Sequence, residues 1–287
     1  MPTITIASGK GGTGKTTLAI NLALAAGEDV ALLDCDVEEP NCHLFLKPEI
    51  TASETVSVMV PVVDHDSCDG CGLCGRICNF SAIVPLQSGP LVFPELCHGC
   101  LGCVRVCPQG AVSAGRRPIG WREEGRAGGI LYSGGRLRVG ESMAPPLIRE
   151  VRRKAPPARW TIIDAPPGTS CPVIETVRGS DQLILVTEPT PFGLHDLKLS
   201  VSMARDIGVR FGVVVNRAGL GDDLVARYCR ENGIPLLLEI PEDRRIAEAY
   251  SRGAPLIEAL PEYGSLFADL LAGLGERLGW ETKPTRS

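Results

Sequence analysis

The sequence predicts an α/β fold with a mostly parallel, doubly wound sheet and a small cysteine-rich α+β insert. Three observations support this fold. Short apolar runs alternate with helical patterns at both ends of the chain, as in sheets covered by helices on both faces. A glycine-rich loop separates the first expected strand from the first expected helix. Eight of the 12 cysteines lie between Cys68 and Cys107, where helical periodicity disappears.

The elements of the larger domain follow from these patterns. Strands are expected at residues 3–8, 30–33, 160–164, 183–187, 211–216 and 235–240. Helices are expected at residues 15–26, 145–154, 194–206, 223–232, 244–252 and 263–278. A hairpin is expected within 119–141, with its turn at Ser133–Gly135. We expect the insert at 60–116, so that the larger domain consists of residues 1–59 and 117–287.

Composition excludes several classes of protein. The 287 residues are 44% hydrophobic and 22% charged, which is typical of a globular protein. A net charge of −5 argues against nucleic acid as a partner. The sequence has no apolar run of about 18 residues, so no membrane span is expected. The chain begins directly with a strand-like segment and without an export signal, which predicts a cytoplasmic protein.

The glycine-rich loop fits the pattern G-x-x-x-x-G-K-[ST], and it follows a strand and opens a helix, as phosphate-binding loops do. Backbone N–H groups of such a loop converge on phosphate oxygens, and the helix N-terminus favours negative charge. Lys15 is expected to reach the β- and γ-phosphates, and the Thr16 hydroxyl is expected to bind Mg²⁺. The predicted loop residues are Gly9, Lys10, Gly11, Gly12, Thr13, Gly14, Lys15, Thr16 and Thr17.

The second lysine of this loop, Lys10, makes the motif resemble the deviant Walker A motif of the MinD/ParA/Mrp and nitrogenase iron-protein group. The resemblance implies an ATPase that binds ATP or ADP with Mg²⁺, and a catalytic Lys10 that reaches the partner subunit's nucleotide across an ATP sandwich. It also implies that Asp36 activates water and, like Asp164, contacts Mg²⁺ through water. Further residues match the segments that sense the γ-phosphate and bind adenine in this group, namely Gly168, Asn216, Pro241, Glu242 and Asp243.

The cysteines form two runs with the spacing C-x2-C-x2-C-x3-C, and the second run is followed by Pro108. Zinc knuckles and disulfides are the alternatives, but zinc sites favour paired C-x2-C units. The runs resemble the bacterial two-cluster ferredoxin arrangement, in which the fourth cysteine of each run binds the other cluster. The first [4Fe–4S] cluster is thus expected on Cys68, Cys71, Cys74 and Cys107, and the second on Cys97, Cys100, Cys103 and Cys78. The whole chain resembles MinD-superfamily ATPases that contain an inserted ferredoxin domain.

Three functions are consistent with these motifs. In the favoured one, nucleotide-dependent changes gate electron transfer to a redox partner protein. The alternatives are an iron–sulfur cluster carrier or assembly ATPase, and a ParA/MinD-type positioning ATPase with a redox-sensing insert. Either a homodimer or a heterodimer with a related ATPase is expected. Cys171 lies seven residues after Asp164, where the nitrogenase iron protein has a cluster ligand, so an interfacial redox contact is one hypothesis; an ordinary thiol is the other.

Overall fold

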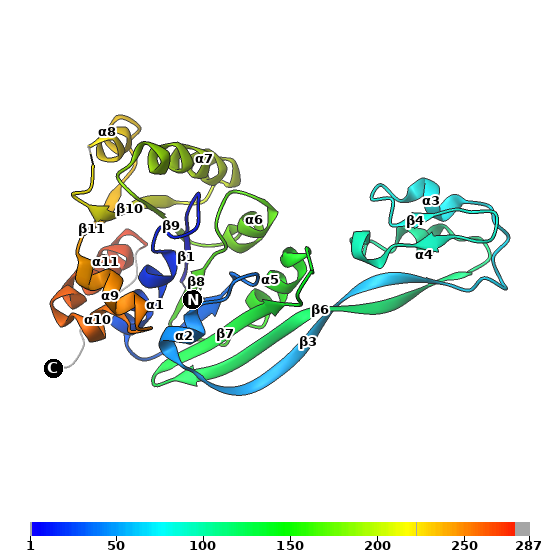
Figure 1. The fold of residues 1–287 in the computed structure, drawn as a ribbon, viewed down its shortest axis with the longest axis horizontal. Coiled ribbons are helices and arrows are strands. Elements are labelled where there is room, and N and C mark those ends of the chain that lie inside the picture. The colour runs from blue at the N-terminus through cyan, green and yellow to red at the C-terminus, as the bar shows by residue number, and fades with distance from the viewer. Residues whose placement is uncertain (1, 222, 279–287) are drawn as a thin grey trace.

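The computed structural model describes residues 2–221 and 223–278, whose main sheet has nine strands (Figure 1). The order across the sheet is β11-β10-β9-β1-β8-β2-β7-β6-β3. From β11 to β7 neighbouring strands are parallel, whereas β6 and β3 are antiparallel additions at one edge. The predicted α/β class with a mostly parallel sheet is therefore confirmed. The strands are β1 (Thr3–Ala7), β2 (Val30–Asp34), β3 (Glu49–Val63), β6 (Val112–Ala127), β7 (Ile130–Leu137), β8 (Trp160–Asp164), β9 (Gln182–Thr187), β10 (Phe211–Ala218) and β11 (Leu236–Pro241).

Helices cover both faces of the sheet, because alternate strand residues point to opposite faces. Ile4 and Ile6 of β1 pack in one buried cluster with α1 and α11, whereas Ala7 packs in another with α6 and α7. None of the described helices has the length and apolar character needed to cross a bilayer. The helices outside the cysteine-rich segment are α1 (Lys15–Ala26), α2 (Cys42–Leu46), α5 (Ala144–Arg153), α6 (Cys171–Val177), α7 (Pro191–Ile207), α8 (Leu224–Glu231), α9 (Arg244–Ser251), α10 (Leu256–Ala259) and α11 (Gly264–Arg277), with a 3₁₀ turn at Pro261–Tyr263.

A two-stranded ribbon carries the cysteines away from the main body (Figure 1). Strand β6 pairs with β7 only from Gly120 to Ala127, but it pairs with β3 as far as Val112. Residues 57–63 and 112–119 thus form the ribbon, and residues 64–111 at its end form the cysteine unit. Its elements are α3 (Leu73–Ile77), β4 (Ile83–Val84), β5 (Leu91–Val92), a 3₁₀ turn (Pro94–Leu96) and α4 (Gly102–Val106). The boundaries expected at 60 and 116 fall inside paired strands, because pairing continues past both positions.

The turn expected at Ser133–Gly135 is wrong. Strand β7 runs through these residues, and the chain reverses at Gly128 and Gly129 instead. A Cβ on Gly134 would lie 2.3 Å from the Tyr132 hydroxyl, and one on Gly135 would lie 2.6 Å from Val37 Cγ1. The Gly-Gly pair therefore serves close packing within a strand, a role that its local sequence does not distinguish from a turn.

Candidate functional site

The glycine-rich loop joins β1 to α1, and two of its glycines are required by backbone conformation or by contact. Gly12 and Gly14 have φ angles of 76° and 97°, in the left-handed region that glycine adopts without a steric penalty. A Cβ on Gly14 would also lie 2.4 Å from Asn216 Nδ2. Lys15, the first residue of α1, is buried. The loop thus turns closely into the start of α1, with its backbone at Gly14 packed against Asn216.

A cavity of about 400 Å³ lies above this loop, at the carboxyl ends of the parallel strands. Its volume is in the range of small-molecule sites, and this edge is where open α/β sheets bind ligands. Eleven of the predicted residues line it, namely Gly11, Gly12, Gly14, Lys15, Thr16, Thr17, Asp36, Asn216, Pro241, Glu242 and Asp243. The remaining wall consists of Glu39, Asn41, Pro167, Arg217, Ile246, Ala247 and Tyr250.

The other predicted residues of this site surround the cavity. The carbonyl oxygen of Thr13 accepts a hydrogen bond from Asn216 Nδ2 at 2.9 Å. Asp164 is buried and accepts a 2.6 Å hydrogen bond from the Thr16 hydroxyl. The N–H of Gly168 donates to the Ser8 carbonyl oxygen at 2.9 Å. Gly168 could donate to a phosphate only after this bond opens, so the predicted contact requires a rearrangement of its loop.

Three carboxyl groups meet beside Lys15, where β2 and β8 end. Burial and the neighbouring Asp164 raise the pKa of Asp34 well above its ordinary value, and burial also raises that of Asp164. Ligand atoms of Asp34, Cys42 and Asp164 lie within 4.8 Å of one another. Asp164 Oδ1 is buried without a hydrogen-bond partner. Oxygen ligands and an unpaired buried carboxylate oxygen fit Mg²⁺, which would be held by Thr16 and, through water, by Asp164 and Asp36.

Asp36 is expected to make the nucleotide-free protein less stable as the pH rises. Burial and then Asp164 raise its pKa from 3.8 to about 7. A raised carboxyl pKa favours folding below pH 4 and loses this contribution as the pH rises through 7. Asp36→Asn should therefore increase the free energy of unfolding at pH 8 by roughly 1–4 kcal/mol and change it little at pH 4.5. Urea denaturation without Mg²⁺ measures both values, and an equal change at both pH values would contradict the raised pKa.

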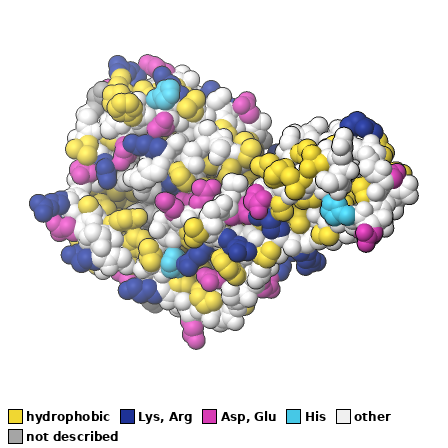
Figure 2. All heavy atoms as spheres, turned by 45° about the vertical axis from the view of Figure 1, so that its right-hand side comes forward, with side chains coloured by type: hydrophobic (Ala, Val, Ile, Leu, Met, Phe, Trp, Pro, Cys, Tyr) yellow, Lys and Arg dark blue, Asp and Glu magenta, His cyan; other side chains and the backbone are white. Residues whose placement is uncertain are grey.

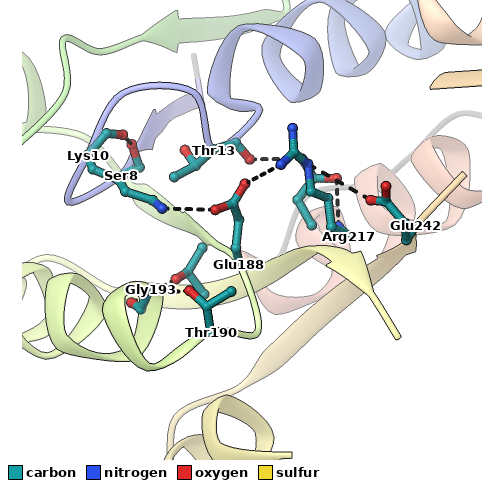
Figure 3. A network of polar contacts seen from close by, with 10 residues as sticks. Ser8, Lys10, Thr13, Glu188, Thr190, Gly193, Arg217 and Glu242 are labelled. Carbon is teal, nitrogen blue, oxygen red and sulfur yellow. Dashed lines mark hydrogen bonds and ion pairs between the residues drawn. The ribbon is translucent and has the colours of Figure 1, made fainter. Parts of the chain in front are cut away.

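Lys10 does not line the cavity but pairs with a carboxylate of its own chain (Figure 3). Its Nζ lies 2.9 Å from Glu188 Oε2, and Arg217 Nη1 lies 3.2 Å from Glu188 Oε1. The side chain of Glu188 is only 10% exposed. Its loop is fixed by the Thr190 hydroxyl, which accepts from the N–H of Gly193 at 3.0 Å. One largely buried carboxylate thus pairs with two cations of its own chain.

Sequence reasoning did not single out Glu188, the cavity role of Arg217, or the apolar wall at Ile246 and Tyr250. Glu188 directly follows β9, just as Asp164 ends β8. A polar residue at the carboxyl end of a predicted parallel strand is a signal that would have found it. Arg217 has a left-handed φ of 57°, a local feature that its sequence does not predict.

The eight cysteines of the cysteine unit are divided between two separate cavities. One cavity is lined by Cys68, Cys71, Cys74 and Cys107, and the other by Cys78, Cys97, Cys100 and Cys103. These groupings coincide with the two sets of cysteines expected from the sequence, and their role as cluster ligands stays a prediction. The crossing arises because Cys78 and Cys107 directly follow the short helices α3 and α4 and face the cavity of the other run.

All eight cysteines are unbridged thiols. Among residues 2–221 and 223–278, only one group of three or more His, Cys, Asp or Glu side chains has its ligand atoms within 4.8 Å of one another, and it consists of Asp34, Cys42 and Asp164. The kind of metal that these cysteines bind stays a prediction.

Cys171 is the first residue of α6 and is exposed. Its position leaves the thiol accessible from outside the chain, so the interfacial redox contact stays a prediction. The three other cysteines outside the cysteine unit, Cys35, Cys42 and Cys229, are buried.

Comparisons with known proteins agree with this geometry. Residues 4–256 match the CobQ/CobB/MinD/ParA nucleotide binding domain. An uncharacterized protein of Methanocaldococcus jannaschii is 33% identical over 225 residues, which are 76% of this chain and 79% of that protein. An iron-sulfur cluster carrier protein of Aquifex aeolicus is 25% identical over 284 residues, which are 90% of this chain and 62% of that protein.

Solved structures share the fold. The septum site-determining protein MinD of Pyrococcus horikoshii, complexed with Mg-ADP, has a TM-score of 0.58 and 22% identity, with 97% of each chain covered. A ParA family ATPase of Chlorobium tepidum has a TM-score of 0.59 and 13% identity, with 95% of this chain and 98% of that chain covered. The family match covers most of the chain, and a cavity lies above the glycine-rich loop. This chain therefore belongs to the CobQ/CobB/MinD/ParA family of nucleotide-binding domains.

Proposed function

We propose that this protein is a MgATP-hydrolysing ATPase that holds two [4Fe–4S] clusters and uses nucleotide-dependent changes to gate electron transfer to a partner protein. The observation that carries the proposal is the division of eight cysteines between two cavities, on a ribbon that continues strands of the nucleotide-binding sheet. The ferredoxin-like insert would be the cysteine unit together with the end of the ribbon.

In the ATPase reaction, water attacks the γ-phosphate in line with the leaving ADP oxygen. The loop N–H groups and Lys15 bind the phosphates, and Asp36 orients the water. Bound Mg²⁺ would neutralise charge that develops on the phosphate oxygens. Lys10 would leave Glu188 and contribute its charge to the nucleotide of a second subunit, either an identical chain or a related ATPase. The deviant Walker A assignment rests on this second lysine.

The cysteine unit has the features of a two-site electron carrier. Cys74 and Cys103, which belong to different sets, pack in one buried cluster with Ile83 and Val112. The two sites therefore share an apolar core that excludes water between them. When bound, a [4Fe–4S] cluster transfers single electrons at a potential set by burial and hydrogen bonds. The N–H of Gly99 donates to Cys97 Sγ at 3.4 Å, which would stabilise the charge of that thiolate.

The surface of the cysteine unit supports a protein partner. Figure 2 shows hydrophobic side chains gathered on the smaller lobe of the molecule. Ile77, Phe80 and Leu96 are 47%, 43% and 51% exposed. Ile77 and Phe80 also line the cavity of the second cysteine set, so a partner that covers them would lie next to that site.

An iron–sulfur carrier is the second candidate, because the carrier protein of Aquifex aeolicus aligns with 90% of this chain. A carrier must release its clusters. It would pass them to an apoprotein acceptor within minutes and lose its own iron, whereas an electron carrier would keep its iron during repeated reduction. Incubation with an apoferredoxin, followed by separation and iron analysis of both proteins, distinguishes the two functions.

The decisive experiment is an anaerobic redox titration followed by EPR, with and without MgATP. We expect about eight irons per chain. A midpoint potential that shifts by about 60 mV corresponds to a tenfold difference in nucleotide affinity between the two oxidation states of a one-electron site. The Lys15→Ala variant is the control, and its potentials should not respond to MgATP. Eight irons with potentials indifferent to MgATP in the parent protein would rule out energetic coupling and leave the carrier and the positioning ATPase with a redox-sensing insert.

A further inference from the structure

Helix α5 lies where the ribbon leaves the main sheet, next to α6 on one side and to β6 and β7 on the other (Figure 1). One buried apolar cluster runs through it without interruption. The cluster contains Val37, which directly follows Asp36, and it also contains Cys97 of the second cysteine set. Its other members include Leu147, Ile148 and Val151 of α5, and Val56, Val58 and Val60 of β3.

Ion pairs link α5 and the residues just before it to their neighbours. Arg149 forms two 3.0 Å hydrogen bonds with the carboxylate of Glu175 in α6. Arg152 donates to the Glu175 carbonyl oxygen at 2.7 Å. Just before α5, Glu141 accepts hydrogen bonds from two backbone N–H groups and pairs with Arg117 of the ribbon. The side chains of Arg117 and Glu141 are 16% and 6% exposed, so water screens this pair little.

Two segments that pack against α5, the one at Val37 and helix α6, begin close to the nucleotide cavity. Asp36 lines the cavity, and the next residue, Val37, packs in the apolar cluster that contains α5. Pro167 also lines the cavity, and α6 begins four residues later at Cys171. A nucleotide that moves either segment must therefore change the packing of α5, since packed interiors transmit small displacements.

The ribbon has a suitable pivot at the same place. The register of β3 against β6 shifts between Val56 and Ser57, where pairing of β6 with β7 also ends at Gly120. Beyond this point the ribbon is held by β3–β6 pairing, by the apolar cluster, by the Arg117–Glu141 pair and by a 2.9 Å hydrogen bond from the Arg138 N–H to the Ile119 carbonyl oxygen. A shift of α5 that carries Glu141 with it would thus turn the ribbon about the bulge.

We propose that α5 couples the nucleotide cavity to the cysteine unit, with Arg149–Glu175 as its link to the nucleotide-facing loops and Glu141–Arg117 as its link to the ribbon. This inference rests on the proposed function, because it describes how nucleotide reaches the cysteine sites. It predicts that MgATP alters the orientation and local stability of the ribbon, whether or not an electron partner is present.

Hydrogen–deuterium exchange of the iron-loaded protein tests the inference. Binding of a non-hydrolysable MgATP analogue should change exchange of the amides in residues 57–63 and 112–119 by about threefold or more, as expected for coupled sites. In Arg117→Gln and in Arg149→Gln, the ratio of the exchange rates with and without the analogue should fall to near one, while calorimetry shows that the analogue binds with the parent affinity. Arg149 is a surface residue, so its variant tests the inference even if Arg117→Gln fails to fold.

Lys154→Gln is the matched control. Lys154, which directly follows α5, pairs with Glu54 of β3, on the main-sheet side of the bulge. Its removal should leave the ribbon response intact. The inference is overturned if ribbon exchange ignores the nucleotide in an iron-loaded protein that binds it, or if both arginine variants respond like the parent. Loss of iron or of nucleotide binding in the parent would instead refute the proposed function, so the two failures are distinguishable.

Discussion

Lys15→Ala is expected to weaken MgATP binding by at least about a hundredfold, because charge-assisted hydrogen bonds contribute roughly 1.5–3 kcal/mol each and Lys15 is expected to make two. Lys15 is buried and faces the cavity from the first turn of α1. Its cation also lowers the pKa of Asp36 and of Asp164. Its loss therefore removes a phosphate ligand and adds uncompensated negative charge to the site.

Isothermal titration calorimetry with MgATP measures this effect. Lys154→Ala removes a lysine far from the cavity and should bind nucleotide like the parent, which controls for the change in net charge. Circular dichroism of Lys15→Ala should match that of the parent, because the lysine contributes to the site rather than to the apolar core. Binding of MgATP by Lys15→Ala within about threefold of the parent would contradict the phosphate-binding role of the loop.

Replacing single cysteines is expected to halve the iron content. Cys74→Ser and Cys103→Ser each remove a buried ligand of one set and should reduce iron from about eight to about four per chain. Cys229→Ser is the control, because this buried cysteine lies in α8, outside the cysteine unit. Anaerobic reconstitution followed by iron and sulfide analysis gives the stoichiometry. Full iron in both ligand variants would contradict cluster binding.

Double variants test which cysteines belong together. Cys74 and Cys107 line the same cavity although they come from different runs. Replacing both should lose no more iron than replacing either one, leaving about four per chain. Replacing Cys74 and Cys103 together should remove all the iron, because each cavity loses a ligand. If the Cys74 and Cys107 pair instead loses everything, the crossed assignment of the fourth cysteines is wrong.

The α/β class could be predicted because the strands of parallel sheets are continuous apolar runs that alternate with helices. The predicted relationship to the MinD/ParA group is likewise confirmed, because the phosphate loop is a contiguous segment whose glycines and lysine are read directly. Both signals are local. The turn predicted at Gly134 and Gly135 was wrong because a turn and a tightly packed strand both require residues without a side chain.

The sequence by itself determined the glycine-rich loop, the spacing of the cysteines and the class of the fold, since each depends on residues close together in the chain. Tertiary structure alone decided that Lys10 pairs with Glu188, 178 positions away. It also decided that the cysteine unit stands on a ribbon held by Arg117 and Glu141. These features depend on which surfaces meet after folding, and that is fixed by strand order and helix packing rather than by any local pattern.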